Sequence, residues 1–311
     1  MRLMDGLRFA LGTLSVLPVR VERVDRQVAG QAMALAPAVG LLLGLLAGLA
    51  LLLPAPPLLG AVLALGLLAL LTRGLHLDGL ADLADGLGSG KPSDQALDIM
   101  KKSDIGPFGV MTLVLMLLAQ VVALADAGLW ALVTACVAGR LALTWACRSG
   151  VPAARPDGLG ATVAGTVHRP AVWLATVAAL LATAVIGLLS APGTGLWAWD
   201  GSDEPTRELT AHYPCMVGSC PPVDDPHPWK GVGMASQFVD VDMVAVSGGS
   251  GGLDGLSGVV VAPVALLAGL GAALLLLAHA RRRLGGITGD VLGALVETAT
   301  AATLVVYAIL G

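Results

Sequence analysis

Three carboxylates lie within eight residues of a chain that is otherwise poor in charge. They are Asp78, Asp82 and Asp85, and they occupy the stretch from 76 to 86. At about 100° per helical residue, the spacing i, i+4, i+7 puts them on one helix face. Like charges on one face repel each other, and Mg²⁺ prefers carboxylate oxygens as ligands. We therefore predict a Mg²⁺ site at Asp78, Asp82 and Asp85; the alternative is an acidic, solvated interhelical loop.

The residues around these acids also suit phosphate chemistry. Gly79 and Gly86 place no side chain beside the acids, so a polyphosphate could approach closely. Lys91, Lys101 and Lys102 follow, and phosphoryl transfer needs metal ions and cationic groups to neutralise charge on phosphate oxygens. The alternative for Lys101 and Lys102 is contact with lipid headgroups at the membrane surface.

Two glycine-rich turns add a second weak signal for phosphate binding. Residues 155–160 read Arg-Pro-Asp-Gly-Leu-Gly, and residues 284–290 read Leu-Gly-Gly-Ile-Thr-Gly-Asp. Backbone N–H groups in such turns can face an anion. Neither turn is specific alone, but together with the acidic stretch they predict one phosphate site.

Charged residues inside apolar runs form a third group of candidates. Arg140 lies within a predicted span, where a charge costs roughly 2.5–3.5 kcal/mol and indicates function by default. The alternative is an arginine that snorkels to the membrane interface. Glu297 could pair with Arg140 or face the bundle interior. His76 and His168 lie near helix ends, where a lone histidine usually caps or packs.

The composition is that of a membrane protein. The chain has 311 residues, of which 56% are hydrophobic and 13% charged, and the mean hydropathy is +0.83. A bilayer span needs roughly 20 apolar residues, and several runs reach this length. The sequence contains no basic patch with interleaved aromatic residues, the pattern that is typical of nucleic-acid binding. We predict an all-α polytopic membrane helical bundle with about seven transmembrane helices: 30–53, 58–75, 108–125, 130–147, 171–191, 258–278 and 291–310.

The distribution of basic residues predicts the orientation. Lysine and arginine concentrate in 1–29, 76–107, 148–170 and 279–290, whereas 54–57 and 126–129 contain none. The positive-inside rule then places the N-terminus in the cytoplasm, together with the acidic stretch and both glycine-rich turns. We expect a single integral membrane domain, 1–311, with 192–257 as a long, partly disordered extracytoplasmic loop. Its Cys215 and Cys220 could form a disulfide or remain thiols.

Four runs of residues occur in the order found in one known family. They are His76-Leu77-Asp78-Gly79-Leu80-Ala81-Asp82 continuing to Gly86, residues 99–109 with Ile-Gly-Pro-Phe-Gly, Gly139-Arg140 with 155–160, and 283–290. These runs resemble the cobalamin synthase family, the adenosylcobinamide-GDP ribazoletransferases. The resemblance covers most of the chain outside 192–257, where the family normally has a short connection.

The resemblance implies a multi-pass inner-membrane enzyme that uses Mg²⁺. It would join α-ribazole, or α-ribazole 5′-phosphate, to adenosylcobinamide-GDP and release GMP, and it leaves open a complex with other enzymes of cobalamin assembly. It implies that Asp78, Asp82 and Asp85 hold Mg²⁺ and that Asp82, Asp85 and Asp290 are catalytic. The substrate- or phosphate-binding residues would be His76, Lys101, Arg140, Arg155, Gly285, Gly286 and Thr288.

Two other functions compete with this interpretation. The stretch 82–86 is similar to part of the motif of CDP-alcohol phosphotransferases, but the Ala-Arg and the two later acids of that motif are missing. A transporter would place charges along a path through the membrane midplane and show repeated halves. Here the acids cluster at one membrane face and no internal repeat is visible.

Overall fold

A computed structural model describes residues 2–21, 23–102, 104–189 and 258–311, and every regular element in these ranges is a helix. Two isolated backbone bridges join loop residues. The elements in chain order are α1 (Arg2–Leu14), α2 (Arg26–Gly48), the 3₁₀ turn η1 (Leu49–Leu52), α3 (Pro57–Leu71), α4 (Leu75–Gly88), α5 (Ser93–Ile99), α6 (Pro107–Ala146), α7 (Gly158–Val163), α8 (Arg169–Leu189), α9 (Gly258–Leu284) and α10 (Gly289–Leu310).

The predicted helical membrane bundle is confirmed. In the described ranges, α2 with η1, α6, α8, α9 and α10 are each long and apolar enough to cross a membrane. The bent pair of α3 and α4 adds one more candidate. Their apolar outer surfaces fit a bilayer, because lipid tails can cover side chains that water could not.

Helix α6 contains two of the predicted spans. Its 40 residues are interrupted at Gly128, whose φ of 75° and ψ of −166° are not helical. Gln120 donates a hydrogen bond to Glu297, and Gly139 lies against the backbone of Val296. In one straight helix, residues 120 and 139 would be roughly 28 Å apart. Both halves of α6 therefore fold back along α10, so the predicted break at 126–128 is real and about seven spans are consistent with the structure.

Helices α3 and α4 meet at a sharp bend of 89°. Arg73 and Gly74 both have left-handed backbone angles, with φ of 57° and 66°. The N–H of Gly74 bonds back to the carbonyl of Ala69, which closes the end of α3. The predicted span 58–75 thus ends earlier, at Leu71. We count α3 as the span and α4 as a helix outside the spanning segments, because α4 carries the three acids.

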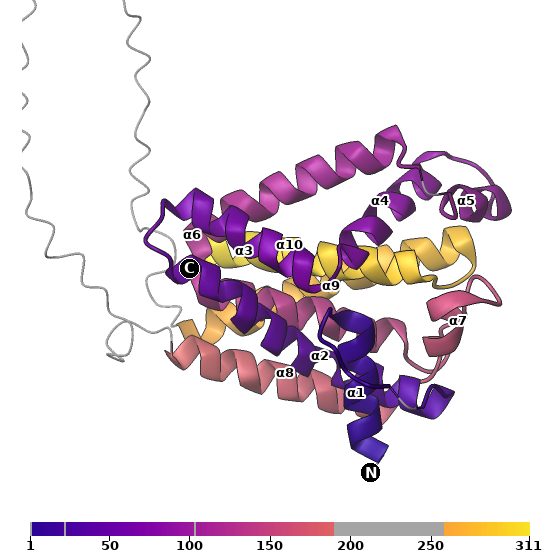
Figure 1. Cartoon of the computed structure of the whole chain (residues 1–311), viewed down its shortest axis with the longest axis horizontal. Coiled ribbons are helices and arrows are strands. Elements are labelled where there is room, and N and C mark those ends of the chain that lie inside the picture. The colour runs from indigo at the N-terminus through magenta and orange to yellow at the C-terminus, as the bar shows by residue number, and fades with distance from the viewer. Residues whose placement is uncertain (1, 22, 103, 190–257) are drawn as a thin grey trace, which may run out of the picture. The chain divides into compact units, whose positions relative to one another are not determined.

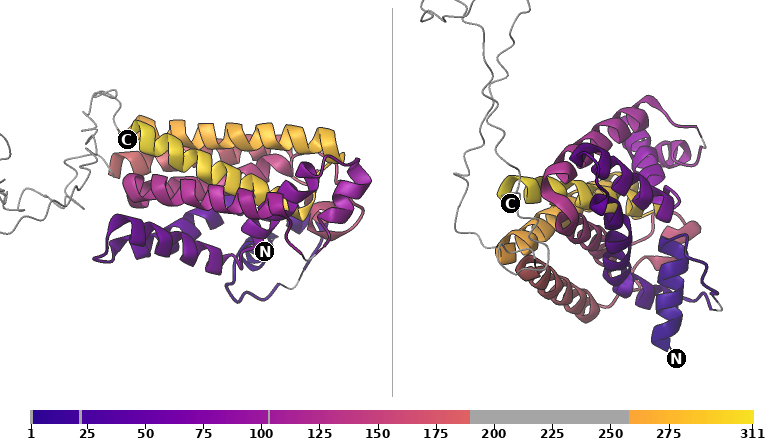
Figure 2. Two further views of the ribbon diagram at one scale, coloured as in Figure 1. Left: turned by 90° about the horizontal axis from the view of Figure 1, so that it is seen from above. Right: turned by 60° about the vertical axis from the view of Figure 1, so that its left-hand side comes forward.

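Helix α10 packs against α4, α6, α7 and α9, and it carries much of the bundle's buried surface. Glycines allow close crossings: a Cβ at Gly269 would lie 2.6 Å from the carbonyl oxygen of Ala299. Small residues of this kind let membrane helices approach each other. Figure 1 shows α5 and α7 at the end of the bundle where α10 begins, with the C-terminus at the opposite end. The views in Figure 2 show the same long helices side by side.

The predicted polar loop, 192–257, lies outside the described residues. The disulfide considered for Cys215 and Cys220 lies there too. Cys136 and Cys147 are buried free thiols.

Candidate active site

Helix α4 presents its acids to two different neighbours. Asp78 is exposed and Asp82 is half-buried, and both line a cavity of about 750 Å³ that the segment after α5 also lines. Asp85 is only 8% exposed and does not line this cavity. The helical spacing of the acids is therefore as predicted, but the third carboxylate faces the start of α6.

Asp85 caps the N-terminus of α6. One carboxylate oxygen accepts the N–H of Gly106 at 2.7 Å, and the other accepts the N–H of Gly109 at 2.9 Å. A negative charge at a helix N-terminus is favourable, and these N–H groups have no partner within the helix. A Cβ at either glycine would collide with the carboxylate, so the Gly-Pro-Phe-Gly run makes room for Asp85.

The first cavity, which we call the acidic cavity, combines acids with three cations. Asp78 and Asp82 line it together with Arg73, Lys101 and Lys102. Its remaining lining is largely apolar and includes Met100, Ile105 and Leu113. Such a cavity can hold a large ligand that has both a charged and an apolar part.

The second cavity, which we call the glycine-rich cavity, lies at the start of α10 and measures about 330 Å³. The predicted turns 155–160 and 284–290 meet there, and Arg155, Thr288 and Asp290 line it. Thr288 caps α10 by accepting the N–H of Val291 at 3.2 Å, and its hydroxyl also bonds to the Asp290 carboxylate. The N-terminus of a long helix favours an anion, so this cavity suits a phosphate or a developing negative charge.

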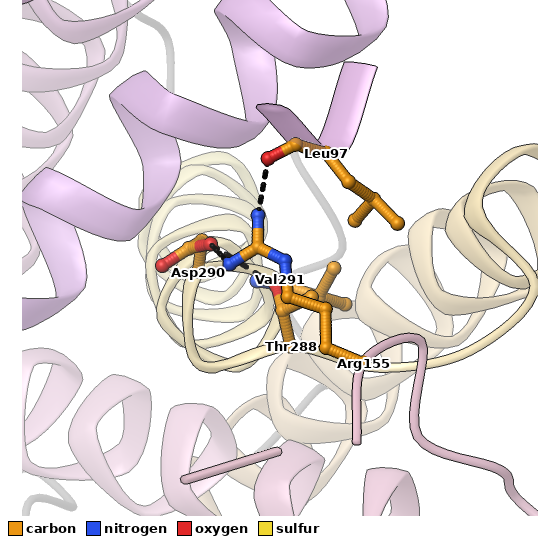
Figure 3. Close-up of polar contacts among 5 residues, drawn as sticks. All are labelled: Leu97, Arg155, Thr288, Asp290 and Val291. Atoms are coloured by element: carbon orange, nitrogen blue, oxygen red, sulfur yellow. Dashed lines mark hydrogen bonds and ion pairs between the residues drawn. The ribbon is translucent and has the colours of Figure 1, made fainter. Parts of the chain in front are cut away.

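Arg155 is fixed at this cavity by two neighbours, as Figure 3 shows. Its Nη2 donates to the carbonyl oxygen of Leu97 at 2.6 Å, and its Nη1 lies 3.7 Å from the Asp290 carboxylate. The buried Nε has no hydrogen-bond partner among the described residues. Arg155 therefore joins α5, the 155–160 turn and α10 while keeping an unsatisfied donor.

Lys101 lines both cavities. Its exposed ammonium can reach a phosphate in either one, because lysine has a long, flexible stem. Arg73 and Asp157, which also line the cavities, were not among the predicted site residues. Two features of the sequence could have identified them: Arg73 lies just before the acidic stretch, and Asp157 lies inside the 155–160 turn.

A close helix crossing brings the two cavities together. A Cβ at Gly79 would lie 2.8 Å from the carbonyl oxygen of Asp290, and one at Gly293 would lie 3.1 Å from the Cα of His76. Gly79 thus serves α4–α10 packing, and Gly86 packs against Met100 of the segment after α5. This corrects the expectation that these two glycines open space for a polyphosphate.

The glycines of the second turn also serve backbone packing. Ala154 donates its N–H to Ile287 at 2.9 Å, and Ile287 donates to Pro152 at 3.0 Å. A Cβ at Gly286 would lie 2.5 Å from this backbone. Gly285 has a φ of 84° and does not line the glycine-rich cavity. The structure therefore gives Gly285 and Gly286 a place in the turn itself, whereas Thr288 reaches the cavity.

His76 and Arg140 are buried in the bundle. They are 3% and 1% exposed, and neither lines a cavity described above. His76 Nε2 and Arg140 Nε and Nη2 are buried without a hydrogen-bond partner among the described residues. Glu297 accepts a hydrogen bond from Gln120 at 2.9 Å. Arg140 is therefore buried in the bundle core, close enough to His76 and Glu297 to interact electrostatically with both.

Burial raises the pKa of Asp82 to about 6, and the charges of Asp78, Asp290 and Asp85 add to this effect. Arg155 acts in the opposite direction. The described residues place no cation within ion-pair distance of Asp78 or Asp82. The acidic cavity therefore presents two carboxylates that have no ion-pair partner among the described residues.

The family model described as cobalamin-5-phosphate synthase matches residues 6–201 and 226–308. The chain belongs to this family. A relative from Frankia casuarinae, named adenosylcobinamide-GDP ribazoletransferase, is 40% identical over 319 residues, covering 97% of this chain and 93% of the relative. A relative of the same name from a Nocardioides species is 45% identical over 193 residues, 60% of this chain and 82% of its own length. No solved structure matches the chain.

The family match includes every residue of both cavities, and it confirms the predicted resemblance. It decides against the CDP-alcohol phosphotransferase and transporter alternatives. The internal segment without a match, 202–225, is narrower than the predicted insertion 192–257 and lies inside it.

Proposed function

We propose that the chain transfers the adenosylcobinamide-phosphate group of adenosylcobinamide-GDP to α-ribazole or α-ribazole 5′-phosphate. Its relatives carry the name of this reaction. The observation that carries the proposal is the pair of cavities that share Lys101, one lined by Asp78 and Asp82 and the other by Arg155 and Asp290. Two substrates can then meet at one cationic group.

The acidic cavity suits the diphosphate of adenosylcobinamide-GDP. Arg73, Lys101 and Lys102 can contact phosphate oxygens, and the apolar lining can face the bulky corrinoid. The glycine-rich cavity then receives the ribazole, with Arg155 and the start of α10 near its polar groups. Lys101 would neutralise charge at the phosphorus between the two cavities.

The transfer is a displacement at phosphorus. A ribose hydroxyl attacks the phosphorus attached to cobinamide, the bond from that phosphorus to GMP breaks, and the hydroxyl proton passes to a carboxylate. Asp290 can accept this proton, because it lines the glycine-rich cavity and is oriented by Thr288 and Arg155. Asp82 is the other candidate, because it lines the acidic cavity together with Lys101.

The residues also fit Mg²⁺. No group of three His, Cys, Asp or Glu side chains in the described part of the chain is arranged to hold a metal alone. Mg²⁺ commonly binds through one or two carboxylates together with substrate phosphates. Asp78 and Asp82 would supply these carboxylates, whereas both oxygens of Asp85 already accept N–H groups. A bound Mg²⁺ would neutralise charge on the diphosphate and on the leaving GMP.

We place the site at the cytoplasmic face of the inner membrane. The basic ends of α8 and α9 lie near each other, and α5 and α7 lie at the same end of the bundle in Figure 1. The positive-inside rule supports a cytoplasmic location for this end.

A transferase assay on purified full-length protein tests the proposal. Adenosylcobinamide-GDP and α-ribazole 5′-phosphate are supplied with Mg²⁺ or EDTA, and GMP and corrinoid products are measured. We expect turnover with Mg²⁺ that is lost in EDTA and in Asp82→Asn. Folded wild-type protein that forms neither product would refute the assignment, and equal turnover in EDTA would refute the metal alone.

A further inference from the structure

Three arginines from different parts of the bundle gather outside both cavities. Arg148 follows α6, Arg169 begins α8, and Arg281 lies in the last turn of α9. The backbone of Arg148 bridges to Val167, two residues before Arg169, and Arg281 bonds to the carbonyl oxygen of Gly150, two residues after Arg148. Burial lowers the pKa of Arg148, and repulsion from Arg281 and Arg169 lowers it further. The ion pairs of the described residues involve only Arg23 and Arg155. This arginine cluster therefore has no acidic partner within the described part of the chain.

The arginine cluster is held in place by its neighbours. Arg148 donates to the carbonyl oxygen of Trp145 at 2.7 Å, and its guanidinium lies over the Trp145 ring, 5.5 Å from the centroid. Arg281 donates to the carbonyl oxygen of Gly150 at 3.5 Å. These contacts oppose the separation that repulsion alone would cause.

The start of α8 adds to the positive potential. A helix N-terminus carries partial positive charge, and an arginine there is unfavourable. The first turn of α8 has no acid, whereas α2 is capped by Asp25 and α10 has Asp290 in its first turn. Of these three helix starts, that of α8 is the one without an acidic residue.

An exposed apolar face continues from the arginine cluster. Arg169, Trp173, Val177 and Leu181 are spaced by four residues and share one face of α8. Trp173, Val177 and Leu181 are 60%, 52% and 64% exposed, and α8 is a candidate membrane span. Trp173 meets Trp145 edge to face, with centroids 5.2 Å apart. The tryptophan pair thus links the arginines to a lipid-facing surface.

We propose that the arginine cluster and this face of α8 bind one anionic phospholipid. The headgroup phosphate would contact Arg148, Arg169 and Arg281, and an acyl chain would lie along Trp173, Val177 and Leu181. The positive charge of the arginines is complementary to an anionic headgroup, and the apolar face of α8 is complementary to a hydrocarbon tail. A free phosphate would use the arginines but leave the apolar face without a role.

Native mass spectrometry of the full-length protein tests the proposal, with mixed phosphatidylglycerol and phosphatidylcholine added to detergent micelles. The test variant is R169Q/R281Q, and the matched control is R20Q/R282Q, which removes two exposed arginines outside the cluster. Arg148 is kept because it bonds to Trp145. We expect wild type and control to retain phosphatidylglycerol selectively, and R169Q/R281Q to bind it roughly 30-fold more weakly, about fivefold for each arginine.

A second variant, Trp173→Ala, tests the apolar half and should also weaken retention of phosphatidylglycerol. Equal retention of the two lipids by wild type, or unchanged retention in R169Q/R281Q, would overturn the proposal. Displacement of the lipid by inorganic phosphate would identify a free-anion site and overturn it too. A dimer cross-linked through Val177→Cys, without bound phosphatidylglycerol, would show that a second copy covers this face.

Discussion

Replacing Asp85 by asparagine separates a structural role for this residue from a metal-binding role. The asparagine oxygen can accept one of the two N–H groups, but its NH₂ group would face the other N–H donor. Hydrogen bonds to a charged group contribute about 1.5–3 kcal/mol, and an unsatisfied buried donor costs about 1–3 kcal/mol. With the charge lost from the α6 N-terminus, we expect Asp85→Asn to reduce the free energy of unfolding by about 2–4 kcal/mol.

Asp82→Asn is the matched comparison, and it should act in the opposite direction. Folding raises the pKa of Asp82 from 3.8 to about 6, so above pH 6 the ionised carboxylate opposes folding. Removing the charge at neutral pH should stabilise the metal-free protein. The gain is at most about 1 kcal/mol, because solvent screens a half-exposed group.

The assay is thermal unfolding of purified protein in detergent with EDTA, followed by tryptophan fluorescence. The midpoint should fall by several degrees for Asp85→Asn and stay level or rise for Asp82→Asn, with the exposed Asp104→Asn as a neutral control. An unchanged midpoint for Asp85→Asn, combined with loss of turnover, would refute the capping role and support Asp85 as a metal ligand or catalytic group.

Three further predictions concern how the site is assembled. Gly79→Ala should lower turnover at least about tenfold by pushing α4 from α10, whereas Gly66→Ala, with open space around its Cβ, should leave turnover unchanged in the same transferase assay. Arg155→Lys keeps the charge but loses the fork that holds Leu97 and Asp290, so kcat/KM should fall roughly 10- to 100-fold while Arg20→Lys has no effect. Titration of EDTA-treated enzyme should show that Asp78→Asn needs more Mg²⁺ for half-maximal turnover than wild type; an identical titration curve would remove Asp78 from the metal site.

Local patterns in the sequence were enough to predict the membrane helices. The length of each apolar run sets whether it can cross a bilayer, and the break at 126–128 is visible in Asp126 and Gly128. The helical register of Asp78 and Asp82 was also predictable, because it depends only on residues within two turns.

The contacts that individual side chains make in the folded protein were harder to predict. Arg140 was recognised as an unusual buried charge, but its distance from the cavities depends on how α6 folds back along α10. The glycines in the 284–290 turn were read as anion contacts, yet Gly286 is needed for backbone contact with 152–154. Both outcomes depend on segments far apart in the sequence, which a local pattern does not contain.

A helical membrane protein with acids, lysines and glycine-rich turns in the loops at one end was predictable from the amino-acid sequence. The length of each apolar run determines whether it can cross the bilayer, and the distribution of lysine and arginine determines the orientation. Both properties belong to short stretches of sequence and need no knowledge of the packing. The capping of α6 by Asp85 and the position of Lys101 in the lining of two cavities depend on how the helices pack. Each helix presents several faces, and packing against α10, α5 and α6 selects which face meets the substrate and which meets a neighbouring helix.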